Sequence, residues 1–406
     1  MNSSQNKKYS LKSLFLRSRG IYRKMPHSFR RVFIPLKWSL SLIRGARFDL
    51  WIITGEEIKS KQGLSIFYAG SKENKNYMIN LIFDKPYKEN YIGKIWIWGV
   101  LKKVRENKFN CSLIIVEAPR FFSLFFITKK WFYIPCWISG EIDIVNEISS
   151  LITNESLKSD IRKIKRNQLS FESTNEIFQL YDFYHNMYLP YITEAHDDEA
   201  IVMEYDLIKE EFKSCDLILV KNKEEYIGGI LIRYTGESAR LWCIGIKNGN
   251  RDYLQLGVVG ALYYFSFCYL KDKGFKKVGL GDTRAFLKDG VLQYKKKWGM
   301  RIIRASQTGF LVNILSAKNS AKEIFFSNPF IYMDKGKLEG AIFIENDRLI
   351  SEKDFREIYK SYYRYGISKL IIYRFGGDVS MVLQTIPPNF SGSIEIRKMR
   401  KLSAGF

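Results

Sequence analysis

Three apolar segments separated by short polar turns follow one another between Cys215 and Ile246. They are Leu217–Val220, Tyr226–Tyr234 and Arg240–Ile246, and the turns between them carry Lys, Glu, Gly and Ser. Short apolar runs bounded by turn residues are typical of β-strands. We therefore expect these three segments to be neighbours in one sheet.

After Ile246 the apolar segments alternate between lengths typical of helices and lengths typical of strands. A long helix is predicted to end at Gly274, because glycine readily takes the left-handed conformation that closes a helix. Asp289 is the predicted cap of a second helix, which Gly299 ends. In order, the predicted elements are a helix at Tyr253–Lys273, a strand at Lys277–Leu280, a helix at Gly290–Trp298, and strands at Met300–Ala305 and Gly309–Ile314.

The flanking regions show weaker patterns that divide the chain into four parts. We expect a basic arm at 1–45, a small α/β unit at 46–150, the main unit at 151–315 and a β-α-β extension at 316–406. The extension reads as strand Ala341–Glu345, a helix from Ser351 to Gly366, and strand Leu370–Arg374. In the small unit the predictions are strands at Leu50–Thr54, Ser65–Ala69, Tyr77–Phe83 and Ser112–Ala118, and a helix at Gly93–Arg105.

Charge is distributed unevenly along these 406 residues. The net charge is +23, and residues 1–50 hold 12 Lys or Arg against a single acid, Asp49. A basic arm favours an anionic partner such as phospholipid headgroups, nucleic acid or a phosphorylated substrate, although basic composition can also serve solubility alone. No recognised DNA- or RNA-binding module accompanies the charge, so DNA binding is not expected.

The five cysteines and three histidines show no zinc spacing, and the cysteines are typical of reduced core thiols. No Walker loop, nucleophile elbow or dinucleotide fingerprint is present, and no metal site is expected. The longest apolar run, Gly257–Leu270, is too short to span a bilayer, and the N-terminus lacks a secretory apolar region. We expect a cytoplasmic protein whose arm contacts the inner face of the membrane.

The segment Gly281–Gly299 carries the candidate chemistry. Asp282 follows a strand end, where ligands of open α/β sheets bind. The helix beyond it ends on Tyr294-Lys295-Lys296-Lys297-Trp298-Gly299. The element order resembles the acyl-binding core of the GNAT superfamily of N-acyltransferases. The terminal hexapeptide resembles its Fem-like branch, whose members have an aromatic-Lys pair followed by an aromatic-Gly.

This resemblance implies an α/β fold in which a GNAT-like mixed β-sheet is flanked by helices, with 46–150 as a degenerate copy. It implies catalytic roles for Lys295, Asp282 and Tyr294. A fixed ammonium at Lys295 would stabilise the negative charge that develops when an amine attacks an ester or thioester carbonyl. The alternative is that Lys295, Lys296 and Lys297 form a solvated helix face.

The resemblance also places the donor at the start of the long helix, where GNAT enzymes hold the pyrophosphate of coenzyme A. The residues there are Asn248, Gly249, Asn250 and Arg251. The usual pyrophosphate signature is absent, and Gly257 and Gly260 are better explained as a close-packing face. No permanently bound cofactor is expected; the donor is either acyl-CoA or aminoacyl-tRNA, and the latter would make tRNA a partner.

The resemblance also implies acceptor contacts from the helix that a capping box at Ser173 and Glu176 opens and that Pro190 ends. The candidate residues in and after this helix are Tyr184, Tyr188, Tyr191 and His196. The predicted enzyme transfers an acyl or aminoacyl group to an amine, on an anionic cell-envelope or polysaccharide precursor. The alternative is a degenerate, non-enzymatic GNAT-fold protein that binds such a precursor or the membrane.

Overall fold

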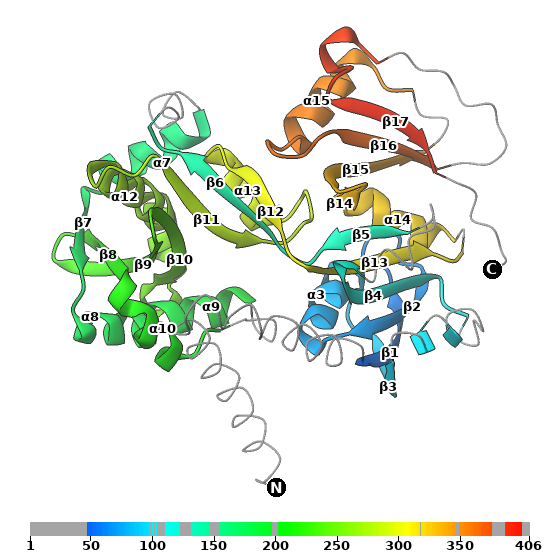
Figure 1. Cartoon of the computed structure of the whole chain (residues 1–406), viewed down its shortest axis with the longest axis horizontal. Coiled ribbons are helices and arrows are strands. Elements are labelled where there is room, and N and C mark those ends of the chain that lie inside the picture. The colour runs from blue at the N-terminus through cyan, green and yellow to red at the C-terminus, as the bar shows by residue number, and fades with distance from the viewer. Residues whose placement is uncertain are drawn as a thin grey trace, which may run out of the picture.

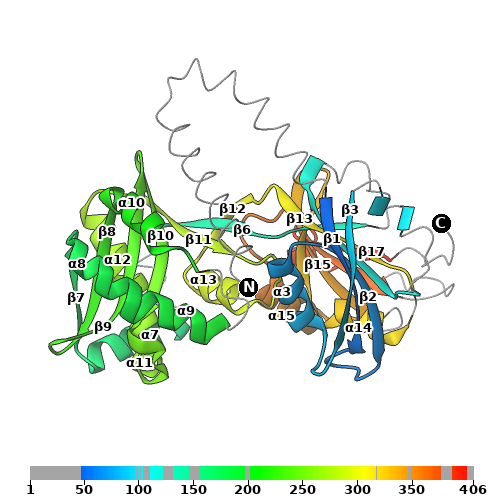
Figure 2. The same cartoon turned by 90° about the horizontal axis from the view of Figure 1, so that it is seen from below.

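A computed structural model arranges the chain as three β-sheets with helices packed around them (Figure 1). It describes residues 47–96, 99–100, 102–103, 110–121, 131–145, 155–196, 202–316, 318–345, 349–375 and 386–399. The predicted arm at 1–45 lies outside these ranges. In both Figure 1 and Figure 2 the second sheet occupies one end of the molecule, and the first and third sheets occupy the other end.

The first sheet has six strands in the order β3-β1-β2-β4-β13-β5. Strands β1 and β2 form an antiparallel hairpin, and β2 is parallel to β4. Helix α3 follows β2, and Ser71 caps it by accepting a hydrogen bond from Asn74 N. The elements are β1 Arg47–Glu56, β2 Gly63–Gly70, α3 Lys72–Ile82, β3 Lys88–Trp96, β4 Leu113–Pro119 and β5 Phe132–Pro135.

The second sheet has seven strands in the order β12-β6-β11-β10-β9-β8-β7. Strands β7 to β10 are antiparallel to one another, and β10 is parallel to β11. Helix α12 packs on β8 and β9, as the continuous apolar face of that helix requires. The predicted strands 217–220, 226–234, 240–246 and 277–280 are therefore neighbours in one sheet, and this prediction is confirmed.

The elements of this region run from β6 to β13 and include several short helical turns. They are β6 Ile138–Asp143, α7 Glu155–Arg166, β7 Leu169–Thr174, α8 Ile177–Asp182, η1 Phe183–Tyr188, α9 Leu189–His196, α10 Tyr205–Glu211, η3 Phe212–Ser214, β8 Cys215–Asn222, β9 Glu225–Thr235, β10 Ser238–Ile246, η4 Lys247–Gly249, α11 Arg251–Leu256, α12 Val258–Asp272, β11 Lys277–Thr283, α13 Gly290–Lys297, β12 Arg301–Ala305 and β13 Thr308–Ile314.

The first two sheets exchange strands. Strand β6 continues from β5 but leaves the first sheet and lies between β11 and β12 of the second, while β13 continues from β12 and lies between β4 and β5 of the first. Figure 1 shows the two crossing segments side by side at the waist of the molecule. The sheets thus do not divide at residue 150, and the predicted domain ranges remain predictions.

The third sheet has the order β14-β15-β16-β17, and β15, α15 and β16 form the predicted β-α-β extension with parallel strands. Ser351 and Asp354 form a capping box at the start of α15. The elements are α14 Asn319–Ser327, β14 Phe330–Asp334, β15 Lys337–Glu345, α15 Glu352–Tyr362, β16 Leu370–Phe375, η5 Pro388–Phe390 and β17 Ile394–Lys398.

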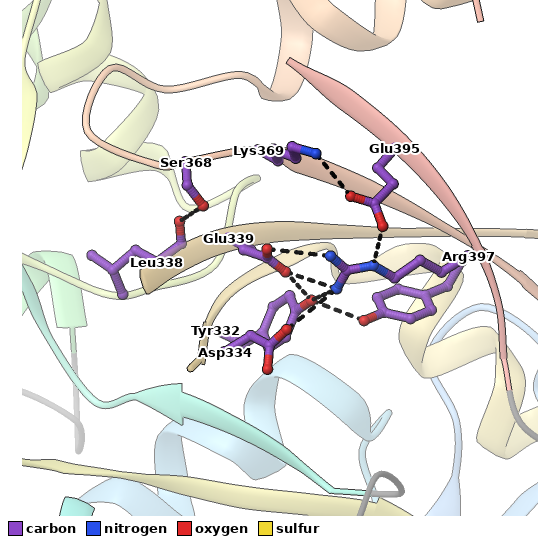
Figure 3. A network of polar contacts seen from close by, with 9 residues as sticks. Tyr332, Asp334, Leu338, Glu339, Ser368, Lys369, Glu395 and Arg397 are labelled. Carbon is purple, nitrogen blue, oxygen red and sulfur yellow. Dashed lines mark hydrogen bonds and ion pairs between the residues drawn. The ribbon is translucent and has the colours of Figure 1, made fainter. Parts of the chain in front are cut away.

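One guanidinium joins three strands of this sheet (Figure 3). Arg397 on β17 donates to Glu395 Oε1 at 2.7 Å, to Glu339 Oε2 at 2.9 Å and to the Tyr332 hydroxyl at 3.1 Å. Lys369 forms a second ion pair with Glu395 at 3.0 Å. Every charged group of this network has an internal partner, so we assign it to holding the sheet together rather than to binding.

Four sequence predictions are wrong in detail. Tyr77–Phe83 lies mostly in helix α3, and the start of the predicted helix Gly93–Arg105 belongs to strand β3. Ser173 pairs within β7, so it caps nothing. The helix does not end at Pro190, since the π-helical turn η1 leads directly into α9, which contains Pro190 and continues to His196.

The third sheet docks on the second through a turn at Gly366, and this contact makes a testable prediction. Gly366 has φ +97°, and a Cβ there would lie 2.1 Å from Ile302 O. Gly366→Ala should destabilise the protein by ~2–4 kcal/mol, the sum of a left-handed penalty and overpacking. Scanning calorimetry should show the loss. Gly392→Ala is the matched control, since nothing lies within 4 Å of its Cβ position; equal melting temperatures for the two variants would contradict the docking contact.

Candidate functional site

The two parallel strands at the centre of the second sheet separate before they end. Strand β10 pairs with β11 only at Ala239–Val278 and Arg240–Gly279, and beyond this point the two strands continue without pairing with each other. Gly281 on β11 has φ +75°, a conformation that turns the backbone away from the regular strand path. The carboxyl end of this parallel pair therefore contains a place where side chains of other elements can enter.

Lys295 enters that place from helix α13. Its ammonium donates to the Asp282 carbonyl oxygen at 2.7 Å and lies 3.7 Å from the position that a Cβ on Gly281 would take. The residue is only 4% exposed. Burial lowers the pKa of the Lys295 ammonium to about 8, although the nearby Asp282 and Asp289 favour the charged form. A buried lysine with a strongly lowered pKa at a strand end is typical of a functional site.

The Asp282 carboxylate forms the more exposed side of the same cluster. It pairs with the Arg240 guanidinium at 2.8 Å and accepts a hydrogen bond from the Ser139 hydroxyl. Burial alone would raise the pKa of Asp282, but these two donors outweigh it and hold the pKa below its ordinary value. Three strands, β6, β10 and β11, thus contribute one polar residue each around the Lys295 ammonium. The sequence prediction that Lys295 lies beside Asp282 is confirmed.

The three consecutive lysines of α13 point to three different parts of the molecule. Lys296 donates to the Lys360 and Ser361 carbonyl oxygens at the end of α15, and Lys297 pairs with Asp160 on α7 at 2.7 Å. A helix turns about 100° per residue, which separates neighbouring side chains in this way. The alternative of a solvated lysine face is therefore wrong.

Tyr294 is not brought to the Lys295 cluster. Its ring packs edge-on against Tyr263 of α12, with 5.3 Å between centroids, and burial raises the pKa of its hydroxyl. The third predicted catalytic residue thus lies in the contact between α13 and α12. Its catalytic role stays an untested prediction, and packing explains its position.

The predicted donor residues lie at the start of α11 rather than at the start of the long helix. Gly257, with φ +95°, breaks the predicted helix 253–273 into α11 and α12, so the prediction of one continuous helix is wrong. Asn248 and Gly249 lie in η4, Asn250 caps α11, and Arg251 forms an ion pair with Glu194 at 3.1 Å. These four residues lie together, but one short helix separates them from the first turn of α12.

Helix α7 covers that first turn. A Cβ on Gly257 would lie 2.9 Å from Lys163 Cβ, and one on Gly260 would lie 3.0 Å from Asp160 Cβ. The prediction of a close-packing face at these glycines is confirmed. Side chains of α7 thus fill the space beside this first turn, and the Asp160 carboxylate there is paired with Lys297 at 2.7 Å. The α12 N-terminus therefore does not fit coenzyme A phosphates as the usual GNAT site does.

The first sheet has a matching arrangement. Strand β2 is parallel to β4, as β10 is to β11, and α3 follows β2. The Glu117 carboxylate accepts from Ser71 N at 2.8 Å, from Ser71 Oγ at 2.7 Å and from Asn74 Nδ2 at 2.9 Å. An internal carboxylate thus satisfies the N-terminus of α3.

The four predicted acceptor residues lie on η1 and α9, and two of them are bonded to the same segment of the protein. The Tyr184 hydroxyl donates to Met203 O at 2.9 Å, and the Tyr188 hydroxyl accepts from Met203 N at 3.1 Å. Both hydroxyls therefore hold the 202–204 segment. Tyr191 packs partly buried against the main core, and His196 is the last residue of α9.

Ser139, Arg240 and Arg284 were not predicted as site residues from the sequence. The Arg284 guanidinium is buried between the rings of Tyr77 and Trp137, at 4.1 and 3.9 Å from their centroids. It comes directly after β11 and connects that strand to the first sheet. Arg240 had a signal in the sequence, since it is the one charged residue in the strand segment 240–246.

Within the described ranges, no group of three or more His, Cys, Asp or Glu side chains is placed to bind a metal ion. None of the helices in the described part of the chain is both long enough and apolar enough to cross a membrane.

The fold is a mixed α/β fold with a GNAT-like sheet, and comparisons with solved structures return GNAT-fold proteins. L-PGS from Bacillus licheniformis is 10% identical, covering 67% of this chain and 86% of that chain, with a TM-score of 0.33. FemX is 12% identical, covering 69% of this chain and 91% of that chain, with a TM-score of 0.33. A tandem GNAT protein from the clavulanic acid biosynthesis pathway is 9% identical, covering 63% of this chain and 80% of that chain, with a TM-score of 0.30.

No protein-family model and no curated protein sequence matches this chain. The identities and TM-scores of the solved structures are too low to carry a function. The functional assignment therefore depends on the chain's own site.

Proposed function

We propose that this protein is an N-acyltransferase that moves an acyl or aminoacyl group from an activated donor to an amine. The observation that carries the proposal is the buried Lys295 ammonium between the separating ends of β10 and β11. Among the described residues its only hydrogen-bond acceptor is a backbone carbonyl, so it retains N–H groups for a reacting oxygen. An ammonium in a site of low dielectric stabilises an oxyanion far more than it would in water.

In this mechanism the acceptor amine attacks the carbonyl carbon of the donor. The new C–N bond forms as the carbonyl electron pair moves to oxygen, and Lys295 stabilises that negative charge. The C–O or C–S bond to the leaving group then breaks, and the amine proton leaves to solvent or to the leaving group. Asp282, fixed by Arg240 and Ser139, holds the strand end against which Lys295 is positioned.

Aminoacyl-tRNA is the donor that we favour over acyl-CoA. The covered first turn of α12 supports this choice, because a terminal ester of RNA does not need the pyrophosphate site that α7 closes. We propose an anionic envelope or polysaccharide precursor as the acceptor, with residues 1–45 contacting an anionic membrane at the cytoplasmic face.

The second candidate is a non-enzymatic protein that binds the same precursor. The carboxylates of Asp160 and Glu117 at both helix starts favour it, since they remove the usual phosphate sites. A thermal-shift screen with aminoacyl-tRNA, acyl-CoA and nucleotide-sugars, followed by a transfer assay with the stabilising donor, separates the two candidates. A stabilising precursor with no transfer from any donor would favour binding alone.

The Lys295 pKa predicts the pH dependence of transfer. The charged form is the active one, so its contribution should be lost as pH rises through about 8. Lys295→Arg keeps its charge across this range, so the ratio of wild-type to Lys295→Arg kcat/KM should fall above pH 8. Both enzymes use the same acceptor amine, so the effect of its titration on kcat/KM cancels in this ratio. A ratio that rises with pH would instead identify Lys295 as a general base.

A further inference from the structure

The third sheet holds the helix that carries Lys295. Helix α13 has only eight residues, and isolated helices shorter than ~12–15 residues are marginal in water. The position of α13, and with it the position of the Lys295 ammonium, therefore depends on contacts with other parts of the protein. The turn that follows α15 lies beside α13 and supplies several of these contacts (Figure 1).

The loop between β11 and α13 is bonded to β14 and to the residue before it. Ile331 N donates to Ala285 O at 2.7 Å, and Leu287 N donates to Pro329 O, also at 2.7 Å. The side chains of Ala285 and Leu287 are fully buried. These backbone bonds fix the path of the loop that leads into α13.

Arg364 adds a side-chain contact to the same loop. It lies in the turn after α15, and its guanidinium donates to Leu287 O at 3.0 Å. The other guanidinium nitrogen donates to Ser361 O at 2.7 Å and to Tyr363 O at 2.8 Å. Leu287 O also accepts a hydrogen bond from the Gln293 side chain of α13. Arg364 is thus connected through one carbonyl oxygen to the helix that carries Lys295.

Burial of the Arg364 guanidinium has a cost that the fold could avoid. The residue is 2% exposed, and its hydrogen-bond acceptors among the described residues are all backbone carbonyls. Burial lowers its pKa to about 10. Apolar side chains often replace a buried charge without loss of stability. An apolar side chain cannot, however, join the end of α15 to the loop before α13.

The other end of α13 is bonded to the same turn. Lys296 donates to Lys360 O and Ser361 O at the end of α15, where the negative end of the helix dipole favours a cation. In β12, which follows α13, Ile302 N donates to Tyr365 O at 2.8 Å. The turn after α15 therefore contacts the loop before α13, the helix itself and the strand after it.

We propose that the third sheet positions α13 for catalysis, and that Arg364 is a positioning residue that fixes where the Lys295 ammonium lies. Arg364 acts on Lys295 through Leu287 and Gln293. A misplacement of about 1 Å can lower a rate ~10²-fold, so a bond outside the site can control turnover. The effect on turnover rests on the proposed transferase function, whereas the positioning of Lys295 does not.

Competitive labelling of the full chain with acetic anhydride over a pH series tests the positioning. For each lysine, the midpoint of the series gives the pKa and the plateau gives the access of the reagent. Arg364→Lys keeps the charge, but one ammonium nitrogen replaces the two nitrogens that reach Ser361 O and Leu287 O separately. The Lys295 midpoint should rise from about 8 towards 10.5 and its plateau should increase, because a displaced ammonium gains water.

Arg397→Lys is the matched control. It makes the same substitution at another arginine of the third sheet, and the bonds of Arg397 to Glu395, Glu339 and Tyr332 stay within that sheet. This variant should have a lower melting temperature and unchanged labelling of Lys295. Gly366→Ala displaces the turn after α15 without any change of charge. It should shift the Lys295 midpoint in the same direction as Arg364→Lys, so the test does not depend on the folding of one variant.

Turnover gives a second readout. Arg364→Lys should lower kcat at pH 7 by ~10-fold or more. The ratio of variant to wild-type kcat should then rise between pH 8 and pH 10, because a higher Lys295 pKa keeps the active, charged form to higher pH. A purely structural role of Arg364 would lower kcat by the same factor at every pH.

Two results would overturn the inference: unchanged labelling of Lys295 in both Arg364→Lys and Gly366→Ala, or an equal change in Arg397→Lys. The proposed transferase function fails separately. A shifted Lys295 midpoint in a protein that transfers no group would keep the positioning role and reject the enzyme. Unchanged labelling in a protein whose Lys295→Met variant loses transfer would do the reverse.

Discussion

Lys295→Met is expected to lower turnover by ~10²–10³, the loss seen when one oxyanion-stabilising donor is removed, while raising the melting temperature. The two effects have one cause. The ammonium is 4% exposed and its one described hydrogen bond is to a backbone carbonyl, so its charge is costly to bury. Methionine has a similar length and no charge, and such replacements of buried charges are often neutral or stabilising.

Lys295→Met also leaves the Asp282 carbonyl without this hydrogen bond, so the melting temperature rises only if the gain from removing the buried charge exceeds that loss. Lys297→Met is the matched control. It breaks the ion pair with Asp160, whose side chain is 16% exposed, and should lower stability without affecting turnover. Lys295→Arg should also be impaired in turnover, since a planar guanidinium does not replace a compact ammonium.

The stability difference should depend on pH with a defined sign. The Lys295 pKa is about 8 in the folded protein and 10.5 when unperturbed, so the unfolded state binds more protons between these values. Wild-type stability relative to Lys295→Met should therefore rise as pH increases from about 8 towards 10.5. Unchanged turnover in Lys295→Met would contradict the assigned role, and a lower melting temperature would contradict the expected gain from removing the buried charge.

Local patterns in the sequence predicted the second sheet well because its strands follow one another. Strands β8 to β10 are apolar runs with turns between them, and β11 follows after α11 and α12, so strands that are consecutive in sequence are neighbours in space. The Lys295–Asp282 contact could also be predicted, since both residues lie in one strand-loop-helix unit. The contact of Ser139 with Asp282 could not be predicted, because Ser139 belongs to a strand more than 140 residues earlier in the chain.

Helix α3 was missed although the sequence carried a signal for it. The run Tyr77–Phe83 is apolar and aromatic, which favours a strand when it is considered alone. The buried positions of α3, however, are Lys75, Met78, Ile79 and Ile82, which follow helical spacing after the Ser71 cap. A window extended to residue 71 would have predicted the helix correctly.

The strand exchange could not be predicted from local pattern, and it makes the second large prediction. Strand β6 lies between β11 and β12, with Ile138 and Ile142 almost fully buried. An isolated fragment 151–315 lacks β6, which leaves β12 without its pairing strand and opens the core. We expect this fragment to be insoluble or to lack a cooperative thermal transition.

A rearranged fragment should restore the fold. Ala305 at the end of β12 pairs with Ile138 at the start of β6, and Arg301 pairs with Glu141, so a short glycine-rich turn can join 155–306 directly to 137–146 as an antiparallel hairpin. This chain supplies β6 in its native position and omits β13, whose partners lie in the first sheet. Circular dichroism should show a cooperative transition for it but not for a control in which 137–146 is scrambled. If fragment 151–315 alone melted as cooperatively as the rearranged chain, β6 would be dispensable to the sheet and the exchange would not be what holds the two units together.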